Sequence, residues 1–218
     1  GNTVNQIIAF PFQDVYNEST TSGHIEQLTL ASPFTSNTYP QLYVSKDTIA
    51  SVFNELDNRD QRFGIDTISG LYRTPYFTNF SASIPVFSKI KIQVNTTGDY
   101  KLPLFGSTIV FTRLEEIALL RAEALAVLNR NDEAVTLLNI LRANRNLAPF
   151  LLSSGRHVQL AIFDERRREL MGEGWRWYDQ IRLNKILAVN PEIENLIQNN
   201  GIYWPISSDV INNNRMIK

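Results

Sequence analysis

The sequence contains no cysteine and only two histidines, His24 and His157, which lie far apart along the chain. Disulfide bridges and thiolate metal sites are therefore excluded, and the two distant histidines offer few imidazole ligands for a metal site. No apolar run approaches the roughly 20 residues that a membrane-spanning helix needs. The formal net charge is −1 over 218 residues, which argues against a nucleic acid as the main partner.

What the chain does have is enough apolar sequence to build a core, 43% of all residues. We expect a single domain over residues 1–218, with a loop-rich part at 1–111 and a helical part at 112–218. The predicted fold class is mainly α, with long loops and a few short strands.

The loop-rich part contains three recognisable elements. A short apolar run at 7–10, stopped by Pro11, predicts a strand. Residues 45–56 predict a helix that Ser45 caps, with an apolar face formed by Ile49, Val52, Phe53 and Leu56. Alternation of apolar and polar residues at 89–94 predicts a half-exposed strand.

The helical part begins with a predicted antiparallel helix pair. Thr112 and Glu115 have the spacing of a capping box, in which each side chain would bond the backbone of the other. Apolar residues then recur at helical steps through Leu128, and a turn at 129–131 leads to a second amphipathic helix that Asn131 or Asp132 would cap. The pair has the size of one tetratricopeptide unit, and no second copy follows at that period.

Three further helices are predicted, at 158–171, 175–187 and 191–198. The segment 201–206 reads as a short extended run ending in a proline turn, and 212–218 as a polar tail.

The most charged stretch is 163–182, where five arginines face five acids. The helical periodicity directs at least one of Arg166 and Arg167 inward, and a buried arginine needs a carboxylate. We interpret the stretch as an internal ion-pair network at the junction of two helices, interrupted near Gly172 and Gly174. The alternative is that its paired carboxylates perform acid–base chemistry.

Three motifs resemble the carboxy-terminal part of the SusD/RagB family. Residues 113–124 (RLEEIALLRAEA) are similar to the family pattern R-x-A-E-x-x-L-x-x-A-E-A, with Glu115 where a small residue is usual. Residues 165–182 (ERRRELMGEGWRWYDQIR) are similar to E-R-x-x-E-L-x-x-E-G-x-R-x-x-D-L-x-R, with Gln180 in place of leucine. Residues 203–206 (YWPI) and 212–214 (NNN) resemble the terminal L-x-P-I-P…N pattern, and Asp57-Asn-Arg59 resembles its D-x-R connector.

The resemblance implies a lipid-anchored, cell-surface nutrient-binding protein of the Bacteroidetes outer membrane. Such a protein binds an oligosaccharide or polysaccharide and passes it to a SusC-like, TonB-dependent transporter. The resemblance implies no enzyme activity, cofactor or metal. The helical repeats and the lipidated anchor that family members carry ahead of this region would lie upstream of this chain, which looks like a fragment or a short member.

A sugar-binding surface combines aromatic faces with planar polar side chains, and the loop-rich part contains such a set. The candidate ligand contacts are Tyr39, Tyr43, Tyr72, Arg73, Tyr76, Phe77 and Asn79. The alternative is that about half of these rings fill the core beneath the loops. The resemblance implies a structural role for the charged stretch 163–182. Its ion-pair residues are Glu165, Arg166, Glu169, Glu173, Arg176, Asp179 and Arg182.

Two other functions remain open from the sequence. The helix pair could be a protein-binding scaffold without a ligand of its own. A glycoside hydrolase could use Glu165, Glu169 or Asp179. Asp57, Arg59 and Asp60 favour a structural connector over a calcium site, because they lack the glycine and distal glutamate of a calcium loop.

Overall fold

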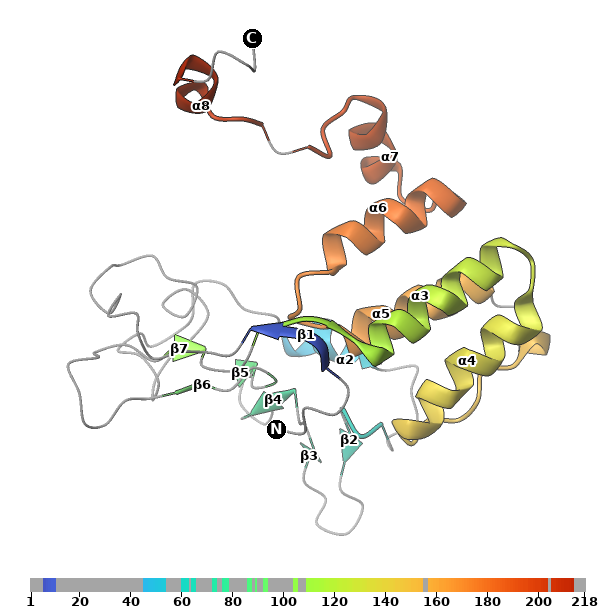
Figure 1. The fold of residues 1–218 in the computed structure, drawn as a ribbon. Coiled ribbons are helices and arrows are strands. Elements are labelled where there is room, and N and C mark those ends of the chain that lie inside the picture. The colour runs from blue at the N-terminus through green and yellow to red at the C-terminus, as the bar shows by residue number, and fades with distance from the viewer. Residues whose placement is uncertain are drawn as a thin grey trace. The chain divides into compact units, whose positions relative to one another are not determined.

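The computed structural model describes residues 6–10, 45–53, 60–62, 64–65, 72–73, 76–78, 86–87, 89, 92–93, 104–105, 109–154, 157–203 and 205–213. Helices dominate this part of the chain (Figure 1). The helices are α2 (Lys46–Phe53), α3 (Leu114–Val127), α4 (Asn131–Asn144), α5 (Val158–Glu169), α6 (Arg176–Leu187), α7 (Pro191–Gln198) and α8 (Ser208–Asn213). The predicted fold class, mainly α with a few short strands, is confirmed.

The strands pair two by two in antiparallel ladders. They are β1 (Gln6–Phe10) with β8 (Ile109–Arg113), β2 (Gly64–Ile65) with β3 (Tyr72–Arg73), β4 (Phe77–Thr78) with β5 (Val86–Phe87), and β6 (Ile92–Gln93) with β7 (Leu104–Phe105). The predicted strand at 7–10 is confirmed as β1, and it places the start of the chain against the segment that leads into α3.

Helices α3 and α4 form the predicted antiparallel pair, and α5 packs against both. Their shared core is built from small and branched side chains: Leu119, Ala122, Leu125, Ala126, Ala134, Val135, Leu138, Leu141, Phe150, Val158, Ala161 and Ile162. The alanines Ala122 and Ala126 are fully buried, which lets the helices approach closely. Asn129 connects the pair in a left-handed conformation with φ of 59°, which asparagine tolerates better than most residues.

A second core joins α2 to β4 and to the end of α5. It contains Ile49, Val52, Phe53, Tyr76 and Phe77, with Phe87 and Met171 packed against it. Ser45 caps α2 as predicted, because its Oγ accepts a hydrogen bond from the backbone N–H of Thr48 at 3.1 Å.

The capping box predicted at Thr112 and Glu115 is wrong. Thr112 belongs to β8, where it pairs with Ile8, and α3 begins two residues later with Arg113 as a cap that makes no side-chain bond. The Thr112 hydroxyl instead donates to Oε2 of Glu116 at 2.7 Å. Helix α4 likewise begins at Asn131 itself, with Arg130 in the cap position.

Contacts within the chain group into two compact units, residues 1–173 and 174–218. In the second unit, α7 has the predicted bounds and is capped by Asn190, whose Oδ1 accepts from the backbone N–H of Glu192 and of Ile193. The buried Asn184 of α6 ties this turn together, accepting from the backbone N–H of Asn190 and donating to Glu194. That residues 1–218 act as one domain stays a prediction.

The prediction of an extended run at 201–206 is wrong at its start. Residues 201–203 form turns, with the backbone N–H of Gly201 bonded to the Leu196 carbonyl at 2.7 Å, where an extended run was expected. Of the predicted polar tail at 212–218, the first two residues belong to α8, which begins at Ser208 and ends at Asn213, and the rest lies outside the described residues.

Candidate functional site

The charged motif lies on α5, and two of its acids point to the same side of that helix. Glu165 and Glu169 are one helical turn apart, and 0% and 1% of their surfaces are exposed. Between these two acids, in the last turn of α5, lie Arg166, Arg167 and Arg168, whose positive charges suit the negative end of the helix dipole. Arg166 is fully buried, which confirms that an arginine of this stretch points inward.

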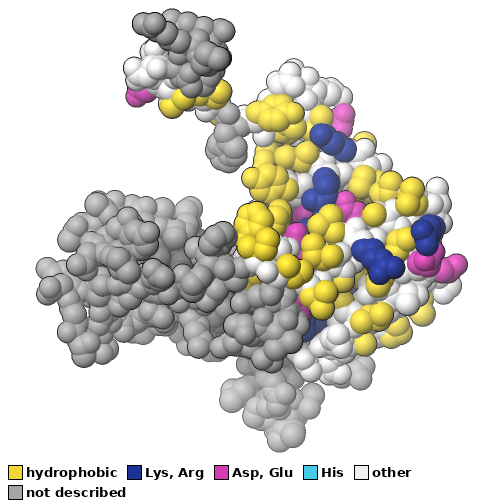
Figure 2. Space-filling model, in the orientation of Figure 1, with side chains coloured by type: hydrophobic (Ala, Val, Ile, Leu, Met, Phe, Trp, Pro, Cys, Tyr) yellow, Lys and Arg dark blue, Asp and Glu magenta, His cyan; other side chains and the backbone are white. Residues whose placement is uncertain are grey.

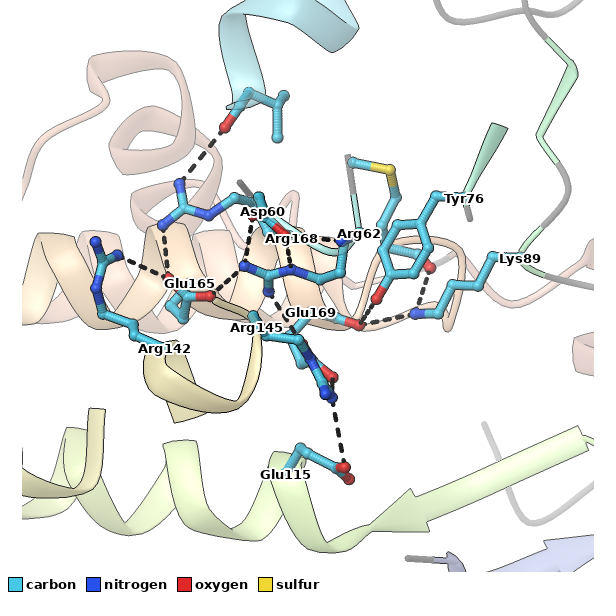
Figure 3. A network of polar contacts seen from close by, with 12 residues as sticks. Asp60, Arg62, Tyr76, Lys89, Glu115, Arg142, Arg145, Glu165, Arg168 and Glu169 are labelled. Carbon is cyan, nitrogen blue, oxygen red and sulfur yellow. Dashed lines mark hydrogen bonds and ion pairs between the residues drawn. The ribbon is translucent and has the colours of Figure 1, made fainter. Parts of the chain in front are cut away.

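Glu165 is held by three guanidinium groups (Figure 3). Its Oε1 accepts from Nη2 of Arg62 at 2.6 Å, while its Oε2 accepts from Nη2 of Arg168 at 2.8 Å and from Nη1 of Arg142 at 3.1 Å. Only Arg168 comes from the motif itself. Arg142 reaches across from α4, and Arg62 comes from the loop-rich part of the chain.

Glu169 accepts four hydrogen bonds from three arginines that are distant in sequence, one of which is again Arg62. Arg145, directly after the last residue of α4, binds it through two atoms, with Nε 2.9 Å from Oε2 and Nη2 2.7 Å from Oε1. Arg113, at the end of β8, donates to Oε1 at 2.7 Å, and Arg62 donates to Oε2 at 3.0 Å. Glu169 therefore joins α5 to α4, to β8 and to the segment around residue 62.

Arg62 is itself fixed by Asp60, two residues earlier. Asp60 accepts from Nε of Arg62 at 3.0 Å, from Nη2 at 2.9 Å and from the backbone N–H at 2.8 Å. The two residues are 1% and 3% exposed. A guanidinium that contacts three carboxylates at once uses the planar fork that distinguishes arginine from lysine.

Three side chains from other parts of the chain bond the carboxyl end of α5. The backbone carbonyl of Glu169 accepts from the Tyr76 hydroxyl at 3.2 Å, from Nζ of Lys89 at 2.7 Å and from Nη2 of Arg113 at 2.6 Å. Lys89 also donates to the Met171 carbonyl at 3.0 Å and lies 4.6 Å from the centre of the Tyr76 ring. These donors satisfy carbonyls that a helix end leaves without partners.

Glu173 completes the network just beyond α5. Arg113 binds it through two atoms, Nε at 3.0 Å and Nη2 at 2.9 Å, and Lys89 forms an ion pair with the same carboxylate. Between α5 and Glu173 the chain turns at Gly172, with φ of 79°. A Cβ on Gly172 would lie 2.5 Å from the Phe87 ring, so only glycine fits this turn.

The charges shift one another's pKa values in a consistent direction. Burial by itself would raise the pKa of Glu169, but the guanidinium groups of Arg145, Arg113 and Arg62 outweigh it and hold that pKa well below its usual range. Glu165 behaves in the same way: burial opposes ionisation, and Arg168 and Arg62 lower its pKa below the usual value. Both carboxylates are therefore ionised at neutral pH.

The basic and phenolic partners shift too. Burial lowers the pKa of Lys89, and the nearby Glu173 only partly restores it. Burial raises the pKa of the Tyr76 hydroxyl, and the negative charge of Glu169 raises it further. Tyr76 is thus a neutral hydrogen-bond donor in this site.

The predicted ion-pair residues fall into two groups. The first group belongs to the first compact unit and consists of Glu165, Arg166, Glu169 and Glu173. Its three glutamates accept the hydrogen bonds of the network. Arg176, Asp179 and Arg182 belong to the second unit. There Asp179 is 2% exposed and pairs with Arg182 at 3.0 Å, while Arg176 is exposed.

The predicted ligand contacts are placed only in part. Tyr39, Tyr43 and Asn79 lie outside the described residues, and for Tyr72 and Arg73 the structure describes only the backbone, in β3. Tyr76 and Phe77 are 8% and 2% exposed and belong to the second core, so their ring faces are covered. For these two, the burial favours the alternative that rings of this region fill the core.

Sequence reasoning missed the residues that pair with Glu165 and Glu169. Arg62, Arg113, Arg142 and Arg145 carry most of these contacts, and the stretch 163–182 contains none of them. A signal was present for Arg62: Asp60-Gln-Arg62 repeats the D-x-R spacing that we assigned to Asp57 and Arg59. Those two residues lie outside the described part of the chain.

Comparison with known proteins gives a family match that covers most of the network residues. A sequence model described as the SusD family matches residues 72–218. The chain belongs to the SusD family. The match includes Lys89, Arg113, Arg142 and Arg145 as well as the α5 motif, so the larger part of the network lies within the family region.

Individual SusD-family relatives are similar over different lengths. The SusD-like protein P38 of Formosa agariphila is 36% identical over 111 residues, covering 46% of this chain and 22% of that protein. A crystal structure of a SusD superfamily protein from Bacteroides thetaiotaomicron is 46% identical, with a TM-score of 0.72 over 89% of this chain and 43% of its own. A SusD homolog from the same organism shares the fold, with 24% identity and a TM-score of 0.70 over 98% of this chain and 46% of its own. This chain thus spans less than half of each.

Proposed function

We propose that this chain is part of a cell-surface glycan-binding protein of a nutrient uptake system. The whole protein captures an oligosaccharide or polysaccharide outside the cell and hands it to a SusC-like, TonB-dependent transporter in the outer membrane. A lipid anchor encoded upstream of residue 1 holds it at the surface. The observation that carries this proposal is membership of the SusD family over residues 72–218. Among the described residues, no helix has the length and apolarity to cross a bilayer.

The proposal makes the protein a binder, with no bond broken in the ligand. Glycoside hydrolysis needs a carboxylic acid that holds a proton near neutral pH, which means a raised pKa. Glu165 and Glu169 have lowered pKa values and are buried behind arginines. Asp179, the third carboxylate considered, is buried and paired with Arg182. This geometry supports a structural role for the three acids.

The ligand surface is proposed in the first part of the chain, at Tyr39, Tyr43, Tyr72, Arg73 and Asn79. Their aromatic faces would stack on the apolar faces of sugar rings, and the arginine and the amide would bond the hydroxyl groups. The buried Tyr76 and Phe77 would support this surface from beneath.

Isothermal titration of the full-length protein against a panel of glycans tests the proposal. We expect one glycan class to bind, and Tyr39→Ala, Tyr43→Ala or Tyr72→Ala to weaken it by about tenfold for each stacking ring that is lost. Tyr203→Ala is the matched control, because Tyr203 is 70% exposed and outside the proposed surface. Absence of binding to every glycan would contradict the proposed function. Equal losses in all four variants would contradict the proposed surface.

A second candidate, a protein-binding scaffold, is favoured by one observation. Exposed apolar side chains line one side of α3 and the strand before it, and hydrophobic side chains are prominent in the space-filling view (Figure 2). They are Phe111, Leu114 and Ile117, with Leu128 directly after α3, and they are between 45% and 66% exposed. Purification from membranes with and without glycan distinguishes the two functions. A scaffold would retain its partner without glycan and would bind no sugar in the titration.

A further inference from the structure

The short hairpin formed by β4 and β5 is tied to the carboxyl end of α5 at both of its ends. Tyr76 directly precedes β4, and Lys89 follows β5 by two residues. The Tyr76 hydroxyl and Nζ of Lys89 donate to the same acceptor, the backbone carbonyl of Glu169, at 3.2 Å and 2.7 Å (Figure 3). Nζ of Lys89 also lies 4.6 Å from the centre of the Tyr76 ring, within the range of a cation–π contact. The entry and the exit of the hairpin therefore meet at one point of α5.

The strands of this hairpin are also packed against the turn that follows α5. Phe77 and Phe87 are antiparallel partners, and their rings meet edge to face with centres 5.5 Å apart. The Phe87 ring lies so close to Gly172 that a Cβ on this glycine would be 2.5 Å away. β4 and β5 have two residues each, and an isolated two-stranded hairpin is marginally stable at best. The order of this hairpin therefore depends on its attachment to the end of α5.

Lys89 makes much of this attachment with a single ammonium group. Besides the Glu169 carbonyl, it donates to the Met171 carbonyl at 3.0 Å, and it forms an ion pair with Glu173. The side chain of Lys89 is 17% exposed, so the ammonium is largely removed from water, and this burial lowers its pKa. A charge in such a place is compensated by its partners rather than by solvent. Because these oxygen acceptors all belong to residues 169–173, the exit of the hairpin has one defined position.

We propose that Lys89 is a positioning residue for glycan binding, which holds the backbone beside the proposed ligand contacts in its binding arrangement. Tyr72 and Arg73 form β3, four and three residues before Tyr76, and Asn79 follows β4 directly in the sequence. Fixing Tyr76 against Lys89 and α5 therefore restrains the chain on either side of it. Such preorganisation strengthens binding, because less conformational entropy is lost when the ligand binds. The inference rests on the proposed function and assigns no contact between Lys89 and the glycan.

Isothermal titration of the full-length protein tests this role, and the probe is the panel glycan that the native protein binds most tightly. Lys89→Met removes the charge from a side chain of similar length, and Lys89→Arg keeps a cation that can donate to the same carbonyls. The matched control is Val135→Ala, which lowers stability in the core of α3, α4 and α5, to which the hairpin does not contribute. Backbone hydrogen exchange at residues 77–78 and 86–87 reports whether the hairpin stays attached.

The variants are compared at a temperature where circular dichroism shows all of them folded. We expect Lys89→Met to raise the Kd about tenfold, which corresponds to a binding arrangement present in about one molecule in ten. Hydrogen exchange at 77–78 and 86–87 should become faster in the same variant. Lys89→Arg should recover part of the affinity, and Val135→Ala should leave the Kd unchanged.

Glycan binding by the native protein with an unchanged Kd in Lys89→Met would overturn the positioning role, and so would an equal loss of affinity in Val135→Ala. A weaker affinity without faster hydrogen exchange would overturn it as well, because Lys89 would then contact the glycan directly. No glycan binding by the native protein would overturn the proposed function itself, and the positioning role with it.

Discussion

Replacing Glu169 with glutamine removes one negative charge from the centre of the network and nearly preserves the shape of the side chain. The native carboxylate accepts four hydrogen bonds, two from Arg145 and one each from Arg113 and Arg62. The glutamine amide oxygen can accept some of these bonds, but its NH₂ group would face a guanidinium donor. Arg145, Arg113 and Arg62 would then each lose one of the carboxylates that compensate them, at a side chain that is 1% exposed.

Removing one partner of a buried ion pair typically costs about 3–5 kcal/mol, because an uncompensated charge stays buried. We expect Glu169→Gln to lower the free energy of unfolding by about that amount, a large share of the roughly 5–15 kcal/mol that stabilises an ordinary domain. Urea denaturation at pH 7, followed by tryptophan fluorescence and circular dichroism, measures this loss.

The control is Glu133→Gln, which breaks the exposed pair with Arg130. Exposed ion pairs are screened by water, so we expect little change in stability from this substitution. If Glu169→Gln were no more destabilising than Glu133→Gln, the network would not bear on stability and our reasoning would be refuted.

Three further predictions concern the same region. The pKa values of Glu165 and Glu169 in the folded state lie below the unfolded value of about 4.3, so the stability that they contribute is complete above that pH and is lost as the pH falls below it. The free energy of unfolding should therefore fall less steeply with decreasing pH in Glu169→Gln than in the native chain. Equal slopes in the two proteins would contradict this. Lys89→Met should lower the free energy of unfolding by about 1–3 kcal/mol, because it leaves the carbonyls of Glu169 and Met171 without their ammonium donor. An unchanged midpoint of thermal unfolding would contradict this prediction. Gly172→Ala should cost about 1–3 kcal/mol through the clash with Phe87, and Phe87→Leu in the same chain should recover part of that loss if the clash is the cause.

Local elements could be read from the sequence because their signals are local. Ser45 before an amphipathic run gave the start of α2, and the helix predicted at 191–198 has the bounds of α7. The capping box at Thr112 failed because pairing with β1 keeps this residue in a strand, and sequence alone does not show that β1 is near. Tertiary pairing overrode a local preference at this point.

The candidate site could be predicted only in part, because its partners are also set by tertiary packing. Equal numbers of arginines and acids in 163–182 suggested that the stretch neutralises itself. The structure confirms burial of Arg166, Glu165 and Glu169 but assigns the two acids mainly to arginines from β8, α4 and the segment at 60–62. Charge counts show that a buried acid needs a partner, whereas which arginine supplies it depends on how the segments pack.

The central claim is that the motif acids of α5 are neutralised by arginines from distant segments, and the pair Arg62–Glu165 tests it most directly. The two residues are 103 positions apart in sequence and 2.6 Å apart in space. A double-mutant cycle on the free energy of unfolding, with Arg62→Met, Glu165→Gln and both together, measures their coupling. Our account predicts that the double substitution costs less than the sum of the single ones by about 1–3 kcal/mol. Additivity within about 0.5 kcal/mol, the range found for independent sites, would contradict it.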